Sequence, residues 1–444
     1  MSFIRKYSAN YKSLLKLAIP IIIGQLGGII TGLADTIMVG QHSTQELAAA
    51  SFVNNVLNAF IIFGTGFSFA LTPLIGESFA RNKKYVVAAW QKNSIVANLL
   101  LSVVLTAVLL VIYLNVEHLG QPSELLPLIK PYFIVSMISV VFVMLANSYR
   151  QFVEAITDPS VSMWVLLSGN LLNIVGNYAL IYGKLGFPEM GLIGAGYSTL
   201  VSRIAMLAAF VIVFMCKPSY RPYRRGFKRM WVLPNRLMRI TKIGVPIALQ
   251  QGLEAATFSL TAIMVGWLGS TELAAHQVVI SISTISFTTY LGLGSATAIK
   301  TSICKGAKDM KQARRTTVAG VHLGLVVSLL TCIALYVFRN DISYIFSDDP
   351  VVSTFVVMLL PILMLYQFVD GAQIVLANAL RGLADVKSIM WISFLTNFLI
   401  AIPAGYILGF PLGMGIQGIW LAYPIGFVFS VALLGIRARK LMNR

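Results

Sequence analysis

A segment near the start of this chain is repeated 226 positions later. The first copy runs from Pro20 through a Met-Val-Gly that ends at Gly40 and on to Glu-Leu-Ala-Ala. The second runs from Pro246 through a Met-Val-Gly that ends at Gly266 and again on to Glu-Leu-Ala-Ala. In both, an early proline lies in an apolar run, and Glu-Leu-Ala-Ala opens the next run. Such a repeat indicates two halves of one membrane architecture, and transporters place substrates where the halves meet.

The apolar content of the chain places it in a membrane. Hydrophobic residues make up 57% of the sequence and charged residues 11%, whereas a soluble domain is about one quarter charged. An apolar helix needs roughly 20 residues to cross a bilayer, and a spanning backbone must satisfy its own hydrogen bonds. We therefore expect an all-α polytopic protein with helical spans near 14–38, 47–72, 90–114, 131–149, 161–182, 191–215, 242–266, 273–298, 317–338, 354–380, 389–409 and 415–436.

The basic residues indicate how the chain is oriented. The net charge is +18, and 30 of the 34 Lys and Arg residues fall in the two tails and the even-numbered loops. Basic loops stay in the cytoplasm, so we expect both termini there, in a multi-pass protein of the cell inner membrane. The charge is then explained by topology and by attraction to anionic lipids, and we expect no nucleic-acid partner.

A long basic segment separates the two halves. It follows the sixth predicted span, and six spans lie on each side of it. Because six is even, both halves enter the membrane with the same orientation, as in a parallel repeat. We predict two pseudo-symmetric six-helix bundles at 1–216 and 242–444, joined by a cytoplasmic linker at 217–241.

Three carboxylates within the predicted spans are candidates for a binding site. They are Asp35 in span one, Glu254 in span seven and Asp370 in span ten. A charge near the centre of a spanning helix costs about 2.5–3.5 kcal/mol on insertion scales, so it needs a partner or a purpose. No Lys or Arg accompanies them at helical spacing. Each therefore holds a proton or awaits a cation, unless it is a protonated carboxyl that only links two helices.

Asparagines form a second polar stripe in span five. Asn170, Asn173 and Asn177 are spaced so that they share one helical face. They fit a binding surface in the same half as Asp35, and they also fit plain interhelical hydrogen bonding.

Other chemistry is not indicated. The four histidines, His42 among them, are scattered without a ligand motif, and the three cysteines have no pairing or metal spacing. Glu46 and Glu272 are expected to support helix N-termini, and Arg381 and Asp385 to form gate or capping pairs at the end of span ten. No phosphate loop, nucleophile elbow or metal signature occurs, so we expect neither an enzyme nor ATP-driven transport.

Several motifs of this chain resemble the multidrug and toxic compound extrusion (MATE) family, in its bacterial NorM-type branch. They are the two repeated hairpins, Asp-Thr-Ile-Met-Val-Gly in span one, Glu254, and Asp370 followed by Leu-Arg-Gly382. The resemblance covers nearly the whole chain. It implies a V-shaped pair of six-helix lobes and a monomer without a cofactor. It also implies multidrug efflux, with associated antibiotic resistance, by antiport of cationic and amphipathic drugs against Na⁺ or H⁺.

The resemblance also implies two groups of site residues. A cation site would lie in the C-terminal half, with Glu254 and Asp370 holding the ion. Its neighbours would be Gln277, Tyr290 and Tyr366. A proton-coupling or substrate cluster would lie in the N-terminal half, formed by Asp35, Asn173, Asn177 and Thr199. Acids in both halves leave the choice between Na⁺ and H⁺ open.

Two other classes of function compete with efflux. A flippase for a lipid-linked saccharide precursor would need basic residues in the central cavity to hold pyrophosphate, and only Arg203 lies well inside a span. A polytopic membrane enzyme or a non-transporting receptor is the third class, and no nucleophile–base or metal pair supports the enzyme.

Overall fold

The computed structural model describes residues 2–339 and 349–443, and these residues are almost entirely helical. The helices are α1 (Ser2–His42), α2 (Thr44–Ser68), α3 (Leu71–Ala80), α4 (Lys84–Leu114), α5 (Leu126–Ala155), α6 (Pro159–Ile181), α7 (Gly191–Cys216), α8 (Arg221–Arg229), α9 (Pro234–Gly266), α10 (Ser270–Gly306), α11 (Met310–Val337), α12 (Pro350–Gly382), α13 (Val386–Phe394), α14 (Ile402–Gly409) and α15 (Gly415–Met442). Short 3₁₀ turns at Val116–His118 and Pro218–Tyr220 and a π-helical segment at Leu395–Ala401 complete the described structure.

The chain forms two compact units, and each contains the first part of a long helix whose remainder lies in the other unit. The N-terminal unit is Ile23–Ala248, and the C-terminal unit combines Met1–Ile22 with Leu249–Arg444. Helices α1 and α9 therefore each begin in one unit and end in the other. Each changes unit two residues after the proline that opens the sequence repeat, Pro20 or Pro246.

The boundaries of these units differ from the predicted ones for the first part of α1 and for the segment that leads into α9. Residues 1–22 were predicted to lie with the first half, but Leu14, Leu17 and Ile21 are buried in a core cluster with residues of α10 and α11. The Tyr11 hydroxyl also lies 2.8 Å from His322 Nδ1 of α11. The reason is that α1 continues as one helix through Pro20, so its apolar first half can pack on distant helices.

The predicted linker at 217–241 is also folded. It contains α8, which packs on α4 of the N-terminal unit. Lys92 Nζ of α4 donates to the carbonyls of Phe227 and Met230 at 3.2 and 2.9 Å. Buried Tyr220 donates to Asp158 Oδ2 at 2.7 Å, and burial together with this contact raises the pKa of the Tyr220 phenol. The linker is therefore part of the N-terminal unit.

Eleven helices of the described residues are long and apolar enough to cross a membrane. The seventh predicted span lies in α9, which is helical but is not among the eleven. The reason is polar content, since Gln250, Gln251 and Glu254 interrupt its apolar run. The eleventh predicted span is divided into α13, the π-helical segment and α14. The prediction of an all-helical membrane protein is confirmed.

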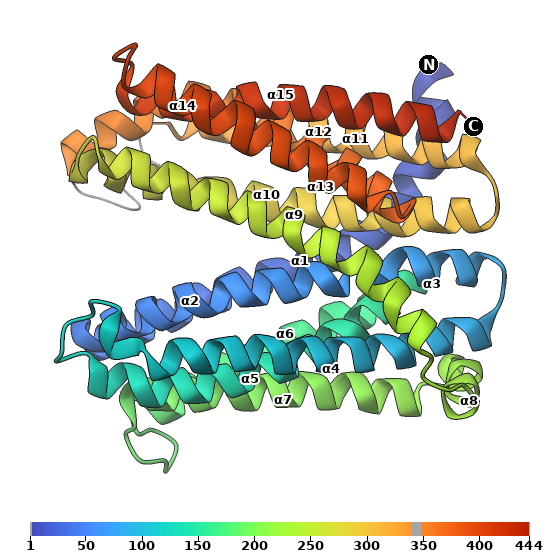
Figure 1. Ribbon diagram of the computed structural model, residues 1–444, viewed down its shortest axis with the longest axis horizontal. Helices are drawn as coiled ribbons and strands as arrows, with labels where there is room; N and C mark the ends of the chain where they lie inside the picture. The colour runs from blue at the N-terminus through green and yellow to red at the C-terminus, as the bar shows by residue number, and fades with distance from the viewer. Residues whose placement is uncertain (1, 340–348, 444) are drawn as a thin grey trace. The chain divides into compact units, whose positions relative to one another are not determined.

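Within each unit, long helices pack side by side around an apolar core. In the N-terminal unit α5 contacts α2, α4 and α7, and in the C-terminal unit α12 contacts α10, α11 and α15 (Figure 1). Backbone geometry repeats as well. Asn82 and Lys308 both have positive φ values (54° and 60°), and so do Thr157 and Ala384 (65° and 61°). Matching left-handed residues at matching places indicate that the two units use the same turns.

Candidate functional site

Asp35 is the centre of a polar cluster in the N-terminal unit. It lies on α1, half-buried, and Asn177 of α6 donates its Nδ2 to Asp35 Oδ1. Asn177 itself is fully buried, and in the described part of the chain its Oδ1 has no hydrogen-bond partner. A buried acceptor without a donor is costly, so this oxygen is suited to receive a donor or a cation next to the carboxylate.

Asn173 and Thr199 complete the predicted group. When the Asn173 amide is oriented to satisfy both neighbours, its nitrogen donates to Asp35 Oδ1 at 2.9 Å. Its oxygen then accepts from the Thr199 hydroxyl at 3.2 Å. Asn173 lies one turn before Asn177 on α6, and Thr199 lies on α7. The structure therefore brings all four residues proposed for this half together from three helices.

The cluster opens into a cavity of about 480 Å³ within the N-terminal unit. This volume is in the range of sites that enclose drug-sized ligands. The walls combine apolar side chains with amides and hydroxyls, and the polar members include Asp35, Asn54, Asn58, Tyr132, Ser136, Asn147, Asn170, Asn173, Thr199, Ser202 and Arg203. Asp35 and Arg203 are the charged residues of this lining.

Arg203 belongs to the site although sequence reasoning did not place it there. It lies on α7, one turn after Thr199, and its guanidinium donates to the Ser139 hydroxyl of α5. The signal that could have found it is helical spacing, because residues four apart share a face. The cavity therefore contains a guanidinium as well as a carboxylate, a combination that the sequence did not predict.

Glu254 is the centre of the second predicted site, in the C-terminal unit. Its Oε1 accepts from Gln250 Nε2 at 2.8 Å on the same helix, and from Gln373 Nε2 of α12 at 3.3 Å. Ser393 of α13 also approaches, at 3.5 Å. Three helices thus converge on this carboxylate with neutral donors.

Asp370 lies on α12, three residues before Gln373, so the two carboxylates are linked through one helical turn. The Asp370 side chain is 2% exposed, and its Oδ2 has no hydrogen-bond partner among the described residues. No third His, Cys, Asp or Glu joins the pair within the described ranges to form a metal-binding group. The pair therefore offers carboxylate oxygens with amide and hydroxyl neighbours.

The three proposed neighbours of this pair take different positions. Tyr366 is buried one turn before Asp370 and packs on Tyr423 and Phe427. Tyr290 is buried against the backbone of Gly371, and its hydroxyl lies 3.0 Å from Gln367 Oε1. Gln277 is exposed on α10, and no hydrogen bond recorded for the described residues joins it to Glu254 or Asp370.

Arg381 is a further member of the Glu254 network. We expected it to form a gate or capping pair, but it is only 3% exposed. It donates from Nη2 to Gln250 Oε1 at 3.0 Å and from Nη1 to Asn378 Oδ1 at 2.9 Å. Two successive hydrogen bonds therefore connect Arg381 to Glu254 through Gln250. Asp385 does form an ion pair as expected, with Arg437 at 2.6 Å.

Comparison with known proteins identifies the family. The MatE family model matches the chain twice, at residues 20–179 and 246–407. The multidrug resistance protein NorM of Photobacterium profundum is 30% identical, covering 98% of this chain and 96% of the relative. The multidrug resistance protein MdtK of Photorhabdus laumondii is 28% identical, with the same coverage.

This chain belongs to the MatE family. The two matches begin at Pro20 and Pro246, so each covers one copy of the sequence repeat. The fold agrees with solved MATE structures. The eukaryotic transporter AtDTX14 superposes with a TM-score of 0.88 at 20% identity, covering 99% of both chains. An outward-facing MATE family multidrug transporter gives 0.89 at 20% identity, covering 98% and 96%.

The MatE matches divide the candidate residues. Asp35, Asn173 and Asn177 lie in the first match, and Glu254 and Asp370 in the second. Thr199 and Arg203 lie between the two matches. The wall of the N-terminal cavity that α7 contributes is therefore outside the two segments that the family model matches.

Proposed function

We propose that this chain is a secondary active antiporter that exports cationic and amphipathic small molecules in exchange for Na⁺ or H⁺. The observation that carries the proposal is the cavity of about 480 Å³ with Asp35 and several asparagines in its wall. Such a cavity encloses a drug-sized molecule, and a half-buried carboxylate attracts an amine or ammonium group. Membership of the MatE family and the multidrug resistance proteins among its relatives support the same conclusion.

The antiport mechanism follows from the acceptors around Asp35. A cationic substrate and a coupling cation would compete for this carboxylate, since each supplies the positive charge that it needs. Asn177 and Asn173 hold the carboxylate in place, and the free Asn177 Oδ1 adds a second acceptor. Release of substrate on one side would then accompany capture of the ion, without any chemical step.

The carboxylates of the C-terminal unit would act as a second cation site. Asp370 is buried with a free oxygen, and Glu254 accepts from amide and hydroxyl groups. Neither lines the cavity of the N-terminal unit. We assign this pair to ion binding and the Asp35 cavity to substrate and proton exchange.

The basic loops support a bacterial inner-membrane location with both termini in the cytoplasm. Flipping of a lipid-linked saccharide precursor is less well supported. Its pyrophosphate would need several cationic groups, whereas Arg203 is the single Lys or Arg in the cavity lining.

Efflux of a fluorescent organic cation from energised vesicles tests the proposal. Na⁺ and H⁺ gradients are imposed separately on wild type, Asp35→Asn and Asp370→Asn. Glu124→Gln, which neutralises an exposed carboxylate in a loop, is the matched control. We expect both core variants to lose gradient-driven efflux and the control to keep it. Absence of wild-type efflux under either gradient would contradict the proposal and favour the flippase.

A further inference from the structure

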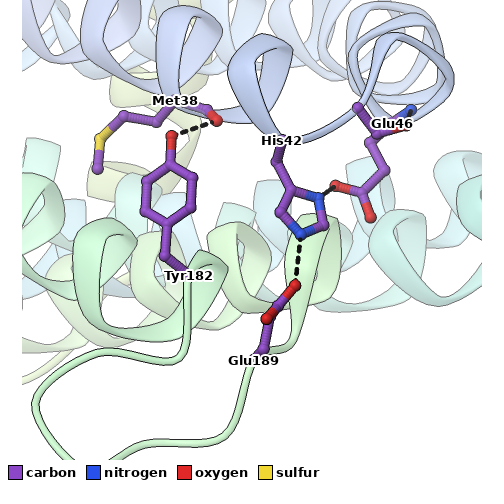
Figure 2. A network of polar contacts seen from close by, with 6 residues as sticks. Met38, His42, Glu46, Tyr182 and Glu189 are labelled. Atoms are coloured by element: carbon purple, nitrogen blue, oxygen red, sulfur yellow. Dashed lines mark hydrogen bonds and ion pairs between the residues drawn. The ribbon is translucent and has the colours of Figure 1, made fainter.

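His42 ends α1 between two carboxylates that come from different elements of the N-terminal unit. Its Nδ1 lies 2.8 Å from Glu46 Oε2 on α2, and its Nε2 lies 3.1 Å from Glu189 Oε1 in the connection between α6 and α7. Figure 2 shows the imidazole ring between the two carboxylates. In the sequence His42 has no visible partner and Glu46 only begins a helix, because Glu189 is 147 positions from His42.

The geometry requires a particular protonation state. A carboxylate only accepts hydrogen bonds, and a neutral imidazole has one N–H donor and one acceptor nitrogen. With a neutral ring, one of the two contacts would bring two acceptors together. Glu189 is 66% exposed, and Glu46 and Glu189 each face a ring nitrogen of His42 with a carboxylate oxygen. Both contacts can exist together only when His42 is an imidazolium.

The Glu46 carboxylate is packed more tightly than the Glu189 carboxylate. Glu46 is 13% exposed, and a Cβ placed on Gly191 would lie 2.4 Å from its Oε1, so the start of α7 packs directly on this group. Glu189 extends into solvent from the α6–α7 connection. When the ring loses a proton, it therefore keeps the bond to Glu46, and the contact with Glu189 is the one that breaks.

A second contact joins the end of α6 to α1 beside His42. The Tyr182 hydroxyl, at the end of α6, donates to the Met38 carbonyl of α1 at 2.8 Å (Figure 2). Tyr182 also lies beside the imidazole, with ring centroids 6.3 Å apart. The titratable groups in contact with His42 are Glu46, Glu189 and Tyr182. Among the described residues, no Lys or Arg forms an ion pair with either glutamate.

The position of this group connects it to the cavity. His42 lies seven residues after Asp35, which is two turns along the same face of α1. Asp35 is bound by α6 through Asn177, and His42 is bound by the connection that follows α6. In the second copy of the 226-residue repeat, Leu268 occupies the position that matches His42, so this histidine–carboxylate arrangement is not repeated there.

We propose that His42, Glu46 and Glu189 form a proton-dependent clasp that holds the end of α1 on the α6–α7 connection and so makes efflux depend on the pH of that side of the membrane. This inference rests on the proposed transport function and adds a positioning residue to it. An imidazole changes charge near physiological pH, within the range in which external pH varies. An exposed ion pair contributes little, so the expected effect on rate is about 2- to 5-fold.

Substrate exchange in vesicles at equal internal and external pH, from 5.5 to 8.5, tests the clasp without a pH gradient. His42→Gln cannot carry the charge, and His42→Arg carries it at every pH. We expect both variants to lose the 2- to 5-fold component of the pH dependence that the clasp contributes, while any component due to Asp35 remains. Relative to wild type, the Gln variant should behave as the open clasp of high pH and the Arg variant as the closed clasp of low pH. His118→Gln, at an exposed histidine of the Val116–His118 turn, is the matched control and should keep the wild-type profile.

A second measurement does not depend on transport. In protein labelled at the histidine rings, nuclear magnetic resonance should show an imidazolium signal of His42 with both N–H protons. This signal should be absent from His42→Gln, and in Glu189→Gln it should titrate at a lower pH. Unchanged exchange profiles in the Gln and Arg variants would overturn the clasp and leave the transport proposal intact. Loss of all exchange in wild type would instead contradict the transport proposal, whatever the ring titration shows.

Discussion

Two Gly→Ala substitutions in the C-terminal unit should change stability in opposite directions. Gly382 ends α12 where it packs on α10, and a Cβ there would lie 2.1 Å from Thr301 Oγ1 and 2.3 Å from the Ala298 carbonyl oxygen. Gly435 lies within α15, and a Cβ there would meet nothing within 4 Å. The chemistry of the change is the same, and only the surroundings differ.

The magnitude follows from these distances. Ordinary contact begins at 3.4 Å, so α10 and α12 would have to separate by about 1 Å to admit the methyl group. The Ala298 oxygen is backbone and cannot rotate away, so the cost is at the upper end of the 1–3 kcal/mol typical of overpacking, at about 3 kcal/mol. In a compatible helix, Gly→Ala stabilises by about 0.4–1 kcal/mol. We expect a net loss of about 2 kcal/mol for Gly382→Ala and a small gain for Gly435→Ala.

Thermal unfolding in detergent, followed with a thiol-reactive dye, measures both effects. The reporters are Cys304 and Cys332, which are buried on α10 and α11. In a unit of this size, each 1 kcal/mol changes Tm by roughly 2–4 °C, so Gly382→Ala should melt about 4–8 °C lower. Equal Tm values for the two variants would refute the argument that close backbone packing requires glycine at the end of α12.

Three further predictions concern polar groups of the two candidate sites. Arg381→Lys should destabilise the protein by about 1–3 kcal/mol, because one ammonium cannot replace the two guanidinium donors to Gln250 and Asn378, and the thiol-reactive melt measures this. Thr199→Val keeps the side-chain shape but removes the hydroxyl bonded to Asn173, and we expect slower efflux with an unchanged Tm. Arg203→Met removes the cation from the cavity and should tighten binding of a permanently cationic substrate by on the order of 1 kcal/mol, because like charges in one cavity repel. Equilibrium binding measures the last effect, and an unchanged affinity would show that Arg203 does not act on the substrate.

Much of the site was predictable because its members share helices. Asn173 and Asn177 lie on one face of a continuous helix, so their spacing predicted the stripe that meets Asp35. The polar groups of α9 were similarly visible, since Gln250 lies one turn before Glu254. Arg203 could have been found in this way too, one turn after Thr199, but a single arginine in an apolar run gave no partner.

The sequence by itself determined the class of molecule, the helices and the twofold repeat. Apolar runs of fixed length and the 3.6-residue period are local properties of the chain, and the repeat is visible by comparison of residues alone. The two prolines, Pro20 and Pro246, were recognised, but their relation to the units was not.

Only the tertiary structure decided which distant segments meet. It placed the first 22 residues in the C-terminal unit, joined Arg381 to Gln250, and brought Glu189 to His42. Each of these contacts depends on how helices pack, and residues more than a hundred positions apart carry no local pattern that names their partner. The physical reason is that periodicity specifies which face of a helix is polar, whereas packing specifies what that face touches.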